Sequence, residues 1–269
     1  MTAAAIDVES WGISGCVVDG GRRGLGWLGV PRGGAVDLGA LHLANRLVGN
    51  APDSAGIETS GGLVLRLRRA AVIAATGAIA AIEVADGPPV GWGTPVALPA
   101  GARVRVRRLD SGCRAYLGVR GGLERRDADL LGTLGEPPAP VATSSAVPRP
   151  LPSAVRLWRG PRLGAVEDGA WQRLISTPLL VTATSRVGCR LAGVALGHAD
   201  SAVLESEGIV EGAVQVPPDG CPIVMLADHP TTGGYPVVAV VDPADLWVMA
   251  QAPVGAAIRC ADAERQGSR

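Results

Sequence analysis

The sequence predicts an all-β or mainly β fold, on three observations. Glycine (38 residues) and proline (21 residues) are abundant in the 269-residue chain. Its apolar runs are only as long as strands, and clusters of turn-forming residues separate them. Many short strands joined by glycine-rich turns are typical of β-sandwiches and β-barrels. Because phenylalanine is absent, valine, alanine and leucine must fill the interior.

One helix is expected at residues 37–50. Asp37 is a suitable N-cap, Leu41 lies on an apolar face, and Gly49 is placed to end the helix. The next motif, residues 56–62 (GIETSGG), is expected to form a turn. Strands are expected around these elements, near residues 14–18, 62–68, 71–75, 79–84, 102–109 and 115–119.

Residues 135–153 (GEPPAPVATSSAVPRPLPS) are rich in proline, serine and alanine, which predicts a linker. It separates an N-terminal unit, residues 1–134, from a C-terminal unit, residues 154–269. In the second unit a short helix is expected to start at Asp242, because Pro243 follows an acidic cap. Strands are expected near residues 155–159, 179–184, 202–204, 213–216, 222–227, 236–241 and 256–260.

The charge composition excludes several kinds of chemistry. All 25 basic residues are arginine, so the chain lacks the lysine that Schiff-base catalysis, pyridoxal phosphate and covalent biotin require. Any biotin must therefore be carried by another protein. Because 25 acidic residues give zero net charge, nothing favours nucleic acid as a partner. The run at 103–108 (RVRVRR) alternates like a strand with one solvent-exposed face.

The cysteines and the apolar runs indicate a cytoplasmic protein. Five widely spaced cysteines without a C-x-x-C motif favour a reducing compartment and argue against structural zinc, and no metal site is predicted. No signal peptide or membrane span is visible, so no membrane partner is expected.

Two glycine-rich clusters are candidates for a site. The first, residues 19–37 (DGGRRGLGWLGVPRGGAVD), has seven glycines in nineteen positions. Its literal G-x-G-x-x-G is not followed by a helix, so we do not interpret it as a dinucleotide fingerprint. The second, residues 228–236 (DHPTTGGYP), lies between two apolar strands. Because paired glycines allow close backbone approach, we expect both loops to line one pocket with their peptide groups.

The order of the motifs resembles a known family. Besides the two clusters, the chain carries ANRLVGN at 44–50, YLGVRGG at 116–122 and SRVGCRL at 185–191. Over residues 12–260 it resembles the allophanate hydrolase subunit 2 family, also called biotin-dependent carboxyltransferase-family proteins. The resemblance implies a cyclophilin-like β-barrel architecture, with two barrel-like units and a few short helices.

The chain departs from the family pattern in three places. Pro230 stands where relatives usually carry glutamine, and the run 184–191 lacks the family's asparagine and tyrosine. Residues 132–135 and the proline linker replace a G-S-R-S-T segment and a glycine-rich loop. If that loop contacts substrate in relatives, this chain binds a different substrate or is a degenerate subunit.

The resemblance implies three alternative functions. In the first, the chain is the C-type subunit of a heteromeric ATP-dependent hydrolase, 5-oxoprolinase, that opens the lactam 5-oxoproline to glutamate. Its partners would be a KipI-like B-type subunit and a LamB/YcsF-like A-type subunit, and ATP would be bound by or shared with a partner. In the second, it is an allophanate hydrolase subunit 2 that transfers a carboxyl group in urea metabolism. In the third, it is a non-catalytic KipA-like regulator that binds a KipI-like inhibitor.

The candidate site residues follow from chemistry that needs donors for anionic oxygens. Acid–base roles are expected for Asp37, Glu58 and His229, the last because it is the only histidine beside a site motif. Arg22 can hold two oxygens of a carboxylate or phosphate. Substrate binding is expected for Asp19, Arg22, Gly33, Gly34, Asn45, Gln215, Thr231, Thr232, Gly233, Gly234 and Tyr235.

Several of these residues have structural alternatives. Asp37 can serve as a helix cap alone, and Arg22 can be an exposed structural arginine. Asn45 is unfavourable inside a helix by roughly half a kcal/mol, so it needs a partner in a neighbouring loop or a ligand. Gln215, isolated among apolar residues, needs a hydrogen bond to backbone or to substrate.

Overall fold

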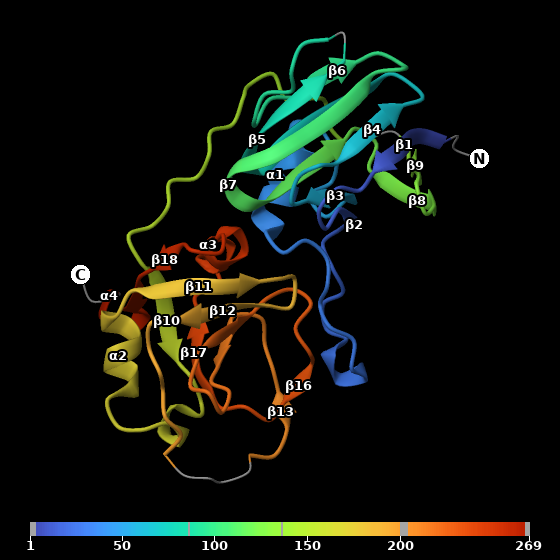
Figure 1. Cartoon of the computed structure of the whole chain (residues 1–269). Coiled ribbons are helices and arrows are strands. Elements are labelled where there is room, and N and C mark those ends of the chain that lie inside the picture. The colour runs from blue at the N-terminus through green and yellow to red at the C-terminus, as the bar shows by residue number, and fades with distance from the viewer. Residues whose placement is uncertain (1–3, 86, 136, 200–203, 267–269) are drawn as a thin grey trace. The chain divides into compact units, whose positions relative to one another are not determined.

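The computed structural model describes residues 4–85, 87–135, 137–199 and 204–266. Strands dominate, helices are few and short, and most strands belong to two barrel-like sheets (Figure 1). The predicted mainly β class is therefore confirmed. Contacts divide the chain into two compact units. The first contains residues up to 21 together with 37–149, and the second contains residues 22–36 together with those from 150 onward.

The contact-defined units differ from the composition-based division at 135–153 in one important respect. Residues 22–36 pack with the second unit, although they come early in the sequence. Val36 belongs to the apolar core of that unit, and the Gly33 N–H donates to the Ala227 carbonyl (3.0 Å). A stretch of the first glycine-rich cluster is thus part of the second barrel.

An antiparallel nine-stranded sheet forms the first unit. Its neighbours follow the order β2-β3-β7-β4-β1-β9-β8, with β5 attached to β7 and β6 to β5. Its strands are β1 (Ala4–Ser10), β2 (Cys16–Val18), β3 (Gly56–Thr59), β4 (Val64–Leu67), β5 (Ala71–Val84), β6 (Val96–Leu98), β7 (Arg103–Val119), β8 (Leu123–Asp127) and β9 (Leu130–Thr133).

The two longest strands, β5 and β7, were each expected as two shorter strands, which is wrong. Gly77 and the polar residues around Gly112 look like breaks in the sequence, and both glycines have positive φ. The register shifts at this level of the β5–β7 pair, and such a bulge lets both strands continue. The alternation expected in β7 is confirmed, since Val104 is buried and Arg105 is exposed.

The predicted first helix is confirmed as α1 (Leu38–Leu47). Asp37 caps it, because its carboxylate accepts a hydrogen bond from the Ala40 N–H (3.0 Å). The helix packs closely on β7 at Gly118, where an added Cβ would lie 2.7 Å from the Ala44 carbonyl oxygen. Glycine is therefore required at this helix–sheet contact.

A buried row of polar groups connects the start of α1 to the sheet. The Asp37 N–H donates to the Tyr116 hydroxyl oxygen (2.8 Å), and the Tyr116 hydroxyl donates to Glu58 Oε2 (2.7 Å). Arg114 Nε lies 3.7 Å from Glu58 Oε1. Glu58 was expected in a turn, but it lies in strand β3 and is buried. Its carboxylate is tolerated there because Tyr116 and Arg114 compensate it.

The second unit is built on an eight-stranded sheet. The order is β18-β11-β12-β15-β14-β17-β10-β19, with only the β10–β19 pair parallel, and β13 and β16 form a separate two-stranded sheet. The strands are β10 (Val155–Arg159), β11 (Leu179–Thr184), β12 (Gly188–Ala192), β13 (Glu207–Gly208), β14 (Ala213–Gln215), β15 (Ile223–Met225), β16 (Thr232–Gly233), β17 (Val237–Val241), β18 (Ala257–Ile258) and β19 (Cys260–Asp262).

Short helices complete the second unit, and the sequence anticipated one of them imperfectly. The helix expected from Asp242 begins later, because the Asp242 carboxylate accepts from the Ala244 N–H (3.0 Å) in a turn and Asp245 becomes the N-cap. The expected strand at 202–204 lies mostly outside the described residues. The helical elements are η1 (Gly26–Leu28), η2 (Leu163–Ala165), α2 (Ala170–Ser176), α3 (Leu246–Gln251) and α4 (Ala263–Gln266).

Two further properties concern the whole described chain. All five cysteines lie in the described part, and no disulfide joins them. None of the described helices combines the length and apolar character that crossing a membrane requires.

We predict that Tyr116→Phe destabilises the first unit by about 2–3 kcal/mol, because it leaves the buried Asp37 N–H and the Glu58 carboxylate without a partner. Urea denaturation followed by far-UV circular dichroism measures this change. The matched control is Tyr235→Phe, which alters the chain's other tyrosine, an exposed one. Equal denaturation midpoints for wild type and Tyr116→Phe would show that the hydroxyl contributes nothing.

We also predict that stability declines in alkali through the same residue. Burial, together with the carboxylates of Glu58 and Asp37, raises the pKa of Tyr116 well above 10.0. The folded chain keeps this proton while the unfolded chain loses it, so the free energy of unfolding falls as the pH rises beyond about 10. Denaturation between pH 9 and 11 should show a smaller decline for Tyr116→Phe than for wild type. Parallel declines would contradict the assignment.

Candidate functional site

A closed loop of the first glycine-rich cluster lies against the second barrel. We call residues 22–32 the arm. The Arg22 N–H donates to the Arg32 carbonyl (2.7 Å), which closes the arm at its base. In Figure 1 the arm is the blue loop beside β13 and β16. Its position places residues from the start of the sequence beside strands formed much later in the chain.

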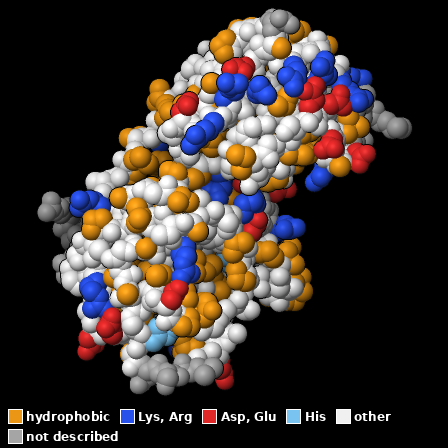
Figure 2. Space-filling view, viewed as in Figure 1, with side chains coloured by type: hydrophobic (Ala, Val, Ile, Leu, Met, Phe, Trp, Pro, Cys, Tyr) orange, Lys and Arg blue, Asp and Glu red, His pale blue; other side chains and the backbone are white. Residues whose placement is uncertain are grey.

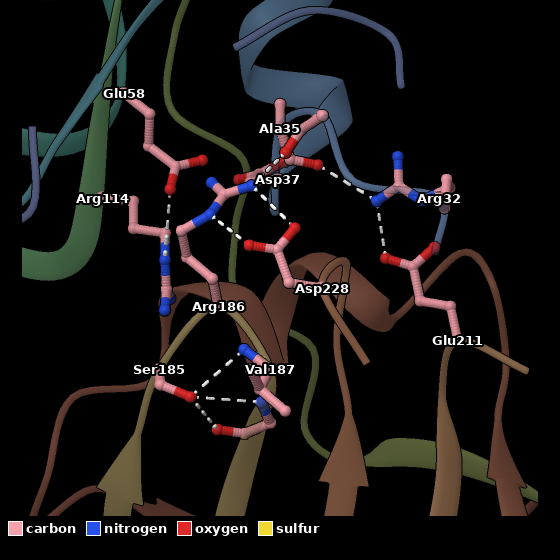
Figure 3. Close-up of polar contacts among 12 residues, drawn as sticks. Arg32, Ala35, Asp37, Glu58, Arg114, Ser185, Arg186, Val187, Glu211 and Asp228 are labelled. Atoms are coloured by element: carbon pink, nitrogen blue, oxygen red, sulfur yellow. Dashed lines mark hydrogen bonds and ion pairs between the residues drawn. The ribbon is translucent and has the colours of Figure 1, made fainter. Parts of the chain in front are cut away.

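Arg186 fixes the segment that follows the arm. Gly33 and Gly34 both have positive φ, 60° and 71°, which glycine adopts without strain. Arg186 Nη2 donates to the Gly34 carbonyl (2.6 Å), while Nε (2.7 Å) and Nη2 (3.1 Å) donate to the Asp228 carboxylate (Figure 3). Since Gly33 donates its N–H to Ala227, the peptide groups of this glycine pair are engaged within the protein.

A tight turn between β11 and β12 presents Arg186. The Ser185 hydroxyl oxygen accepts from the N–H groups of Val187 (3.1 Å) and Gly188 (3.3 Å). Hydroxyl-to-backbone bonds of this kind stabilise turns. The guanidinium therefore projects from a preformed turn.

A pocket of ≈ 280 Å³ lies between the arm and the body of the second unit. Residues of both glycine-rich clusters line it, as the sequence led us to expect, but the lining includes long side chains as well as glycine backbone. The lining residues are Arg22, Arg23, Gly24, Gly26, Val30, Pro31, Arg32, Ile209, Val210, Glu211, His229 and Thr231.

Arg32 is the most constrained cation of this pocket. Its Nη2 donates to Glu211 Oε1 (2.7 Å) and to the Ala35 carbonyl (3.1 Å) (Figure 3). Its Nε and Nη1 are shielded from solvent and have no hydrogen-bond partner among the described residues. Buried N–H groups are rarely left in this state. One carboxylate thus compensates only part of a guanidinium that lies in a pocket wall.

His229 contributes a nitrogen base to the same pocket. The side chain is buried, and Nδ1 lies 2.7 Å from the Pro230 carbonyl oxygen. Because a carbonyl only accepts hydrogen bonds, Nδ1 carries the proton, which leaves Nε2 of the neutral ring as an acceptor. The geometry therefore fixes which nitrogen of His229 could receive a proton.

The other residues of the second cluster form a small sheet beside the pocket. Thr232 and Gly233 make strand β16, which pairs with β13. A Cβ on Gly233 would lie 2.6 Å from the Ile209 side chain, so this glycine is required by packing. Gln215 donates to the Tyr235 carbonyl (3.2 Å), and of its two alternatives the backbone partner is the one observed. Gly234, unlike Gly33 and Gly34, does not have positive φ.

Four predicted residues belong to the first unit and not to this pocket. Asp37 caps α1 and Glu58 bonds Tyr116, as described above. Asn45 donates to the carbonyls of Pro52 (2.9 Å) and Ser54 (2.6 Å), so its partner is a neighbouring loop. Asp19 accepts from the Gly21 N–H (2.8 Å). Each of these groups has a structural role.

Sequence reasoning did not select three residues that shape the site: Arg32, Arg186 and Glu211. Arg32 and Arg186 lay within motifs that the sequence analysis quoted, so the signal was present. Arginine in a glycine-rich or turn motif, where little else packs, is the pattern that could have identified them. Glu211 has no such signal, because its partner Arg32 is 179 positions away.

The chemistry of the pocket is that of three guanidinium groups, Arg22, Arg23 and Arg32, facing one carboxylate, Glu211. Guanidinium groups bind carboxylates and phosphates with two parallel hydrogen bonds. The described residues contain no group of three or more side chains suited to hold a metal ion. The arrangement therefore favours an organic or phosphate anion as ligand.

The fold and the pocket define a mainly β protein with two barrel-like units and an arginine-lined anion pocket. The chain belongs to the family described as "Carboxyltransferase domain, subdomain A and B", which matches residues 28–135 and 126–261. This finding confirms the family resemblance found in the motifs.

Curated relatives agree with this membership. The 5-oxoprolinase C subunit of Escherichia coli K12 is 32% identical over 269 residues, covering 89% of this chain and 85% of the relative. The protein of the same name from Haemophilus influenzae is 31% identical, covering 94% and 89%. The urea amidolyase of Saccharomyces cerevisiae is 40% identical over 105 residues, which is 39% of this chain and 6% of the relative.

Solved structures share the fold over nearly the whole chain. The crystal structure of TTHA0988 is 35% identical with a TM-score of 0.86, covering 96% of this chain and 56% of that one. The Kluyveromyces lactis urea amidolyase superimposes with a TM-score of 0.87 at 24% identity, covering 97% of this chain and 19% of that one. This chain thus spans only part of either solved protein.

We predict that Arg186→Gln destabilises the second unit by about 1–3 kcal/mol, because it removes the donors to Gly34 and Asp228. The double variant with Asp228→Asn should be less destabilised than the sum of the two single variants, since the residues are in contact. Arg190→Gln is the matched control: its ion pair with Asp219 is more exposed, so we expect a cost below about 1 kcal/mol. Equal effects of the two arginine substitutions in denaturation experiments would refute the role of Arg186.

Proposed function

We propose that this chain is the C-type subunit of an ATP-dependent lactam hydrolase that converts 5-oxoproline to glutamate. The observation that carries the proposal is the match, over most of both chains, to two bacterial proteins named as the C subunit of 5-oxoprolinase. The proposal extends to a KipI-like partner and to a LamB/YcsF-like partner. It also extends to ATP, held by a partner or shared with one.

The pocket suits one part of this task. 5-Oxoproline carries a single carboxylate, and Arg22 at the exposed edge of the pocket can grip two carboxylate oxygens. Arg32, held in place by Glu211 and Ala35, adds a fixed positive charge. Preorganised charge of this kind stabilises anions without reorganisation during the reaction. His229 Nε2 is the group we propose for accepting a proton.

Residues with structural roles are proposed only as supports. Asp37, Asn45 and Glu58 hold the first unit together through the contacts described above. Gln215, Thr232 and Gly233 shape the loop that carries Thr231 to the pocket. We therefore assign substrate contact to the pocket side chains, and positioning to the other predicted residues.

A second candidate function is carboxyl transfer in urea metabolism, which the family description and the partial match to urea amidolyase favour. It would need biotin on a separate carrier protein, since this chain has no lysine. A third, regulatory function requires only that the chain bind a KipI-like protein. These three alternatives differ in which reaction the assembled complex performs.

Reconstitution tests the proposal. The chain is purified and combined with the KipI-like and LamB/YcsF-like proteins of its source organism, and ADP and glutamate are measured with 5-oxoproline as substrate. We expect turnover from the full assembly and none from the chain alone. Turnover with urea and a biotinylated carrier, but not with 5-oxoproline, would support the second function, and a stable complex without either reaction would support the third.

Substitution of the pocket arginine sharpens this test. In the active assembly, Arg32→Gln should raise the KM for 5-oxoproline at least about tenfold, as expected for the loss of a charge-assisted contact. Arg162→Gln is the control, because it removes an exposed arginine of the same unit that pairs with Glu207 outside the pocket lining. Equal KM values for the wild type and Arg32→Gln would remove the pocket from the mechanism.

A further inference from the structure

The tip of the arm is ordered but carries no packing partner among the described residues. Within the tip, the N–H groups of Leu28 (3.0 Å) and Val30 (3.3 Å) both donate to the Leu25 carbonyl. Cβ atoms built at Gly24 and Gly29 would meet nothing within 4 Å. The tip is therefore a hydrogen-bonded turn held away from the body of its unit.

This turn exposes an unusual amount of apolar surface. Trp27 is 82% exposed, Leu28 57% and Leu25 36%, and Val210, which lines the pocket with the arm, is 58% exposed. Figure 2 shows hydrophobic side chains gathered at the tip of the arm. Single exposed leucines are common, but a contiguous apolar group around an exposed tryptophan marks an interaction site. Tryptophan is also among the residues that most often dominate binding energy.

The charges beside the tip indicate the character of its partner. Arg22 and Arg23 are exposed, and neither forms an ion pair in the part of the chain that the structure describes. Charges at the rim of an interface are arranged to complement those of the partner. A matching surface would therefore combine an apolar recess for Trp27 with carboxylates at its edge.

The comparisons show which kind of chain should provide that surface. TTHA0988 contains a region that covers 96% of our chain, yet this region is only 56% of TTHA0988. The urea amidolyase of Kluyveromyces lactis likewise contains the fold as 19% of its length. In these proteins the module is covalently joined to further polypeptide. Where the same module is a separate chain, a noncovalent interface must replace the covalent link.

We propose that the arm tip, Leu25, Trp27 and Leu28 flanked by Arg22 and Arg23, is the docking element for a separate protein chain equivalent to the remainder of TTHA0988. The inner side of the same arm lines the pocket, so the docked chain would lie at the pocket mouth. The partner class is shared with the proposed function. The binding test does not depend on lactam hydrolysis.

The test measures binding directly. The source organism's homologue of the TTHA0988 segment outside our chain is produced separately, and its Kd for the full-length chain is measured by isothermal titration calorimetry. Trp27→Ala should raise the Kd at least about thirtyfold, the effect expected of a central aromatic anchor. Arg23→Glu should weaken binding less, and its effect should shrink at high salt. Neither variant should shift the melting temperature, because both side chains are exposed.

Matched controls and opposite outcomes complete the experiment. Leu28→Ala is compared with Leu151→Ala, since Leu151 is a leucine 73% exposed elsewhere in the same unit; only Leu28→Ala should weaken binding. Equal Kd values for wild type and Trp27→Ala, or no binding of the wild type, overturn the proposal. A self-association that Trp27→Ala abolishes, seen by sedimentation without the partner, would assign the tip to a second copy and also overturn it. Trp27-dependent binding without turnover would leave this inference standing while the proposed reaction fails.

Discussion

The guanidinium of Arg186 joins two segments of the second unit that lie far apart in the sequence. On one side it bonds the Gly34 carbonyl, directly after the arm, and on the other it grips Asp228, directly before His229. The separation between the two pocket walls is therefore set by one side chain. A lysine could not make these contacts together, because its ammonium lacks the planar fork of arginine. The pocket depends on this bridge in the way that α1 depends on Tyr116.

Both polar centres follow the same physical rule. A buried or half-buried carboxylate, Glu58 or Asp228, is held by donors fixed in turn by backbone contacts. Arg32 departs from the rule, since Glu211 and Ala35 occupy only one of its three nitrogens. That incomplete satisfaction distinguishes a group kept for a ligand from one kept for the fold. It is the reason why we placed the anion site there and not at the better satisfied Glu58.

The sequence predicted the elements whose signals are local. The cap at Asp37, the apolar face of α1 and the alternation of Val104 with Arg105 each need only a few neighbouring residues. What it could not supply were partners distant along the chain. Glu58 looked like a turn residue because its compensating hydroxyl is 58 positions away in Tyr116. The long strands β5 and β7 were divided because a bulge and a turn share the same residues until a partner strand is known.

The same limit applied to the site. Arg22, His229 and Thr231 were chosen because they stand in glycine-rich motifs, and the structure brings them to one pocket. Arg32 stood in the same motif, but its value as a site residue depends on Glu211, far along the chain. The peptide groups of Gly33 and Gly34 were expected to be open to a ligand. Only the fold reveals that Ala227 and Arg186 already use them.

The interleaving of residues 22–36 with the second unit has a consequence for biosynthesis. As the ribosome releases the chain, the first barrel can form around a segment whose own neighbours have not yet been translated. Val36 and the arm must wait, with apolar surface uncovered, until β14 to β17 emerge. Closing such a long-range contact is slow and leaves a period of vulnerability to misassembly. The last barrel to be synthesised is thus completed by one of the earliest pieces of the polypeptide.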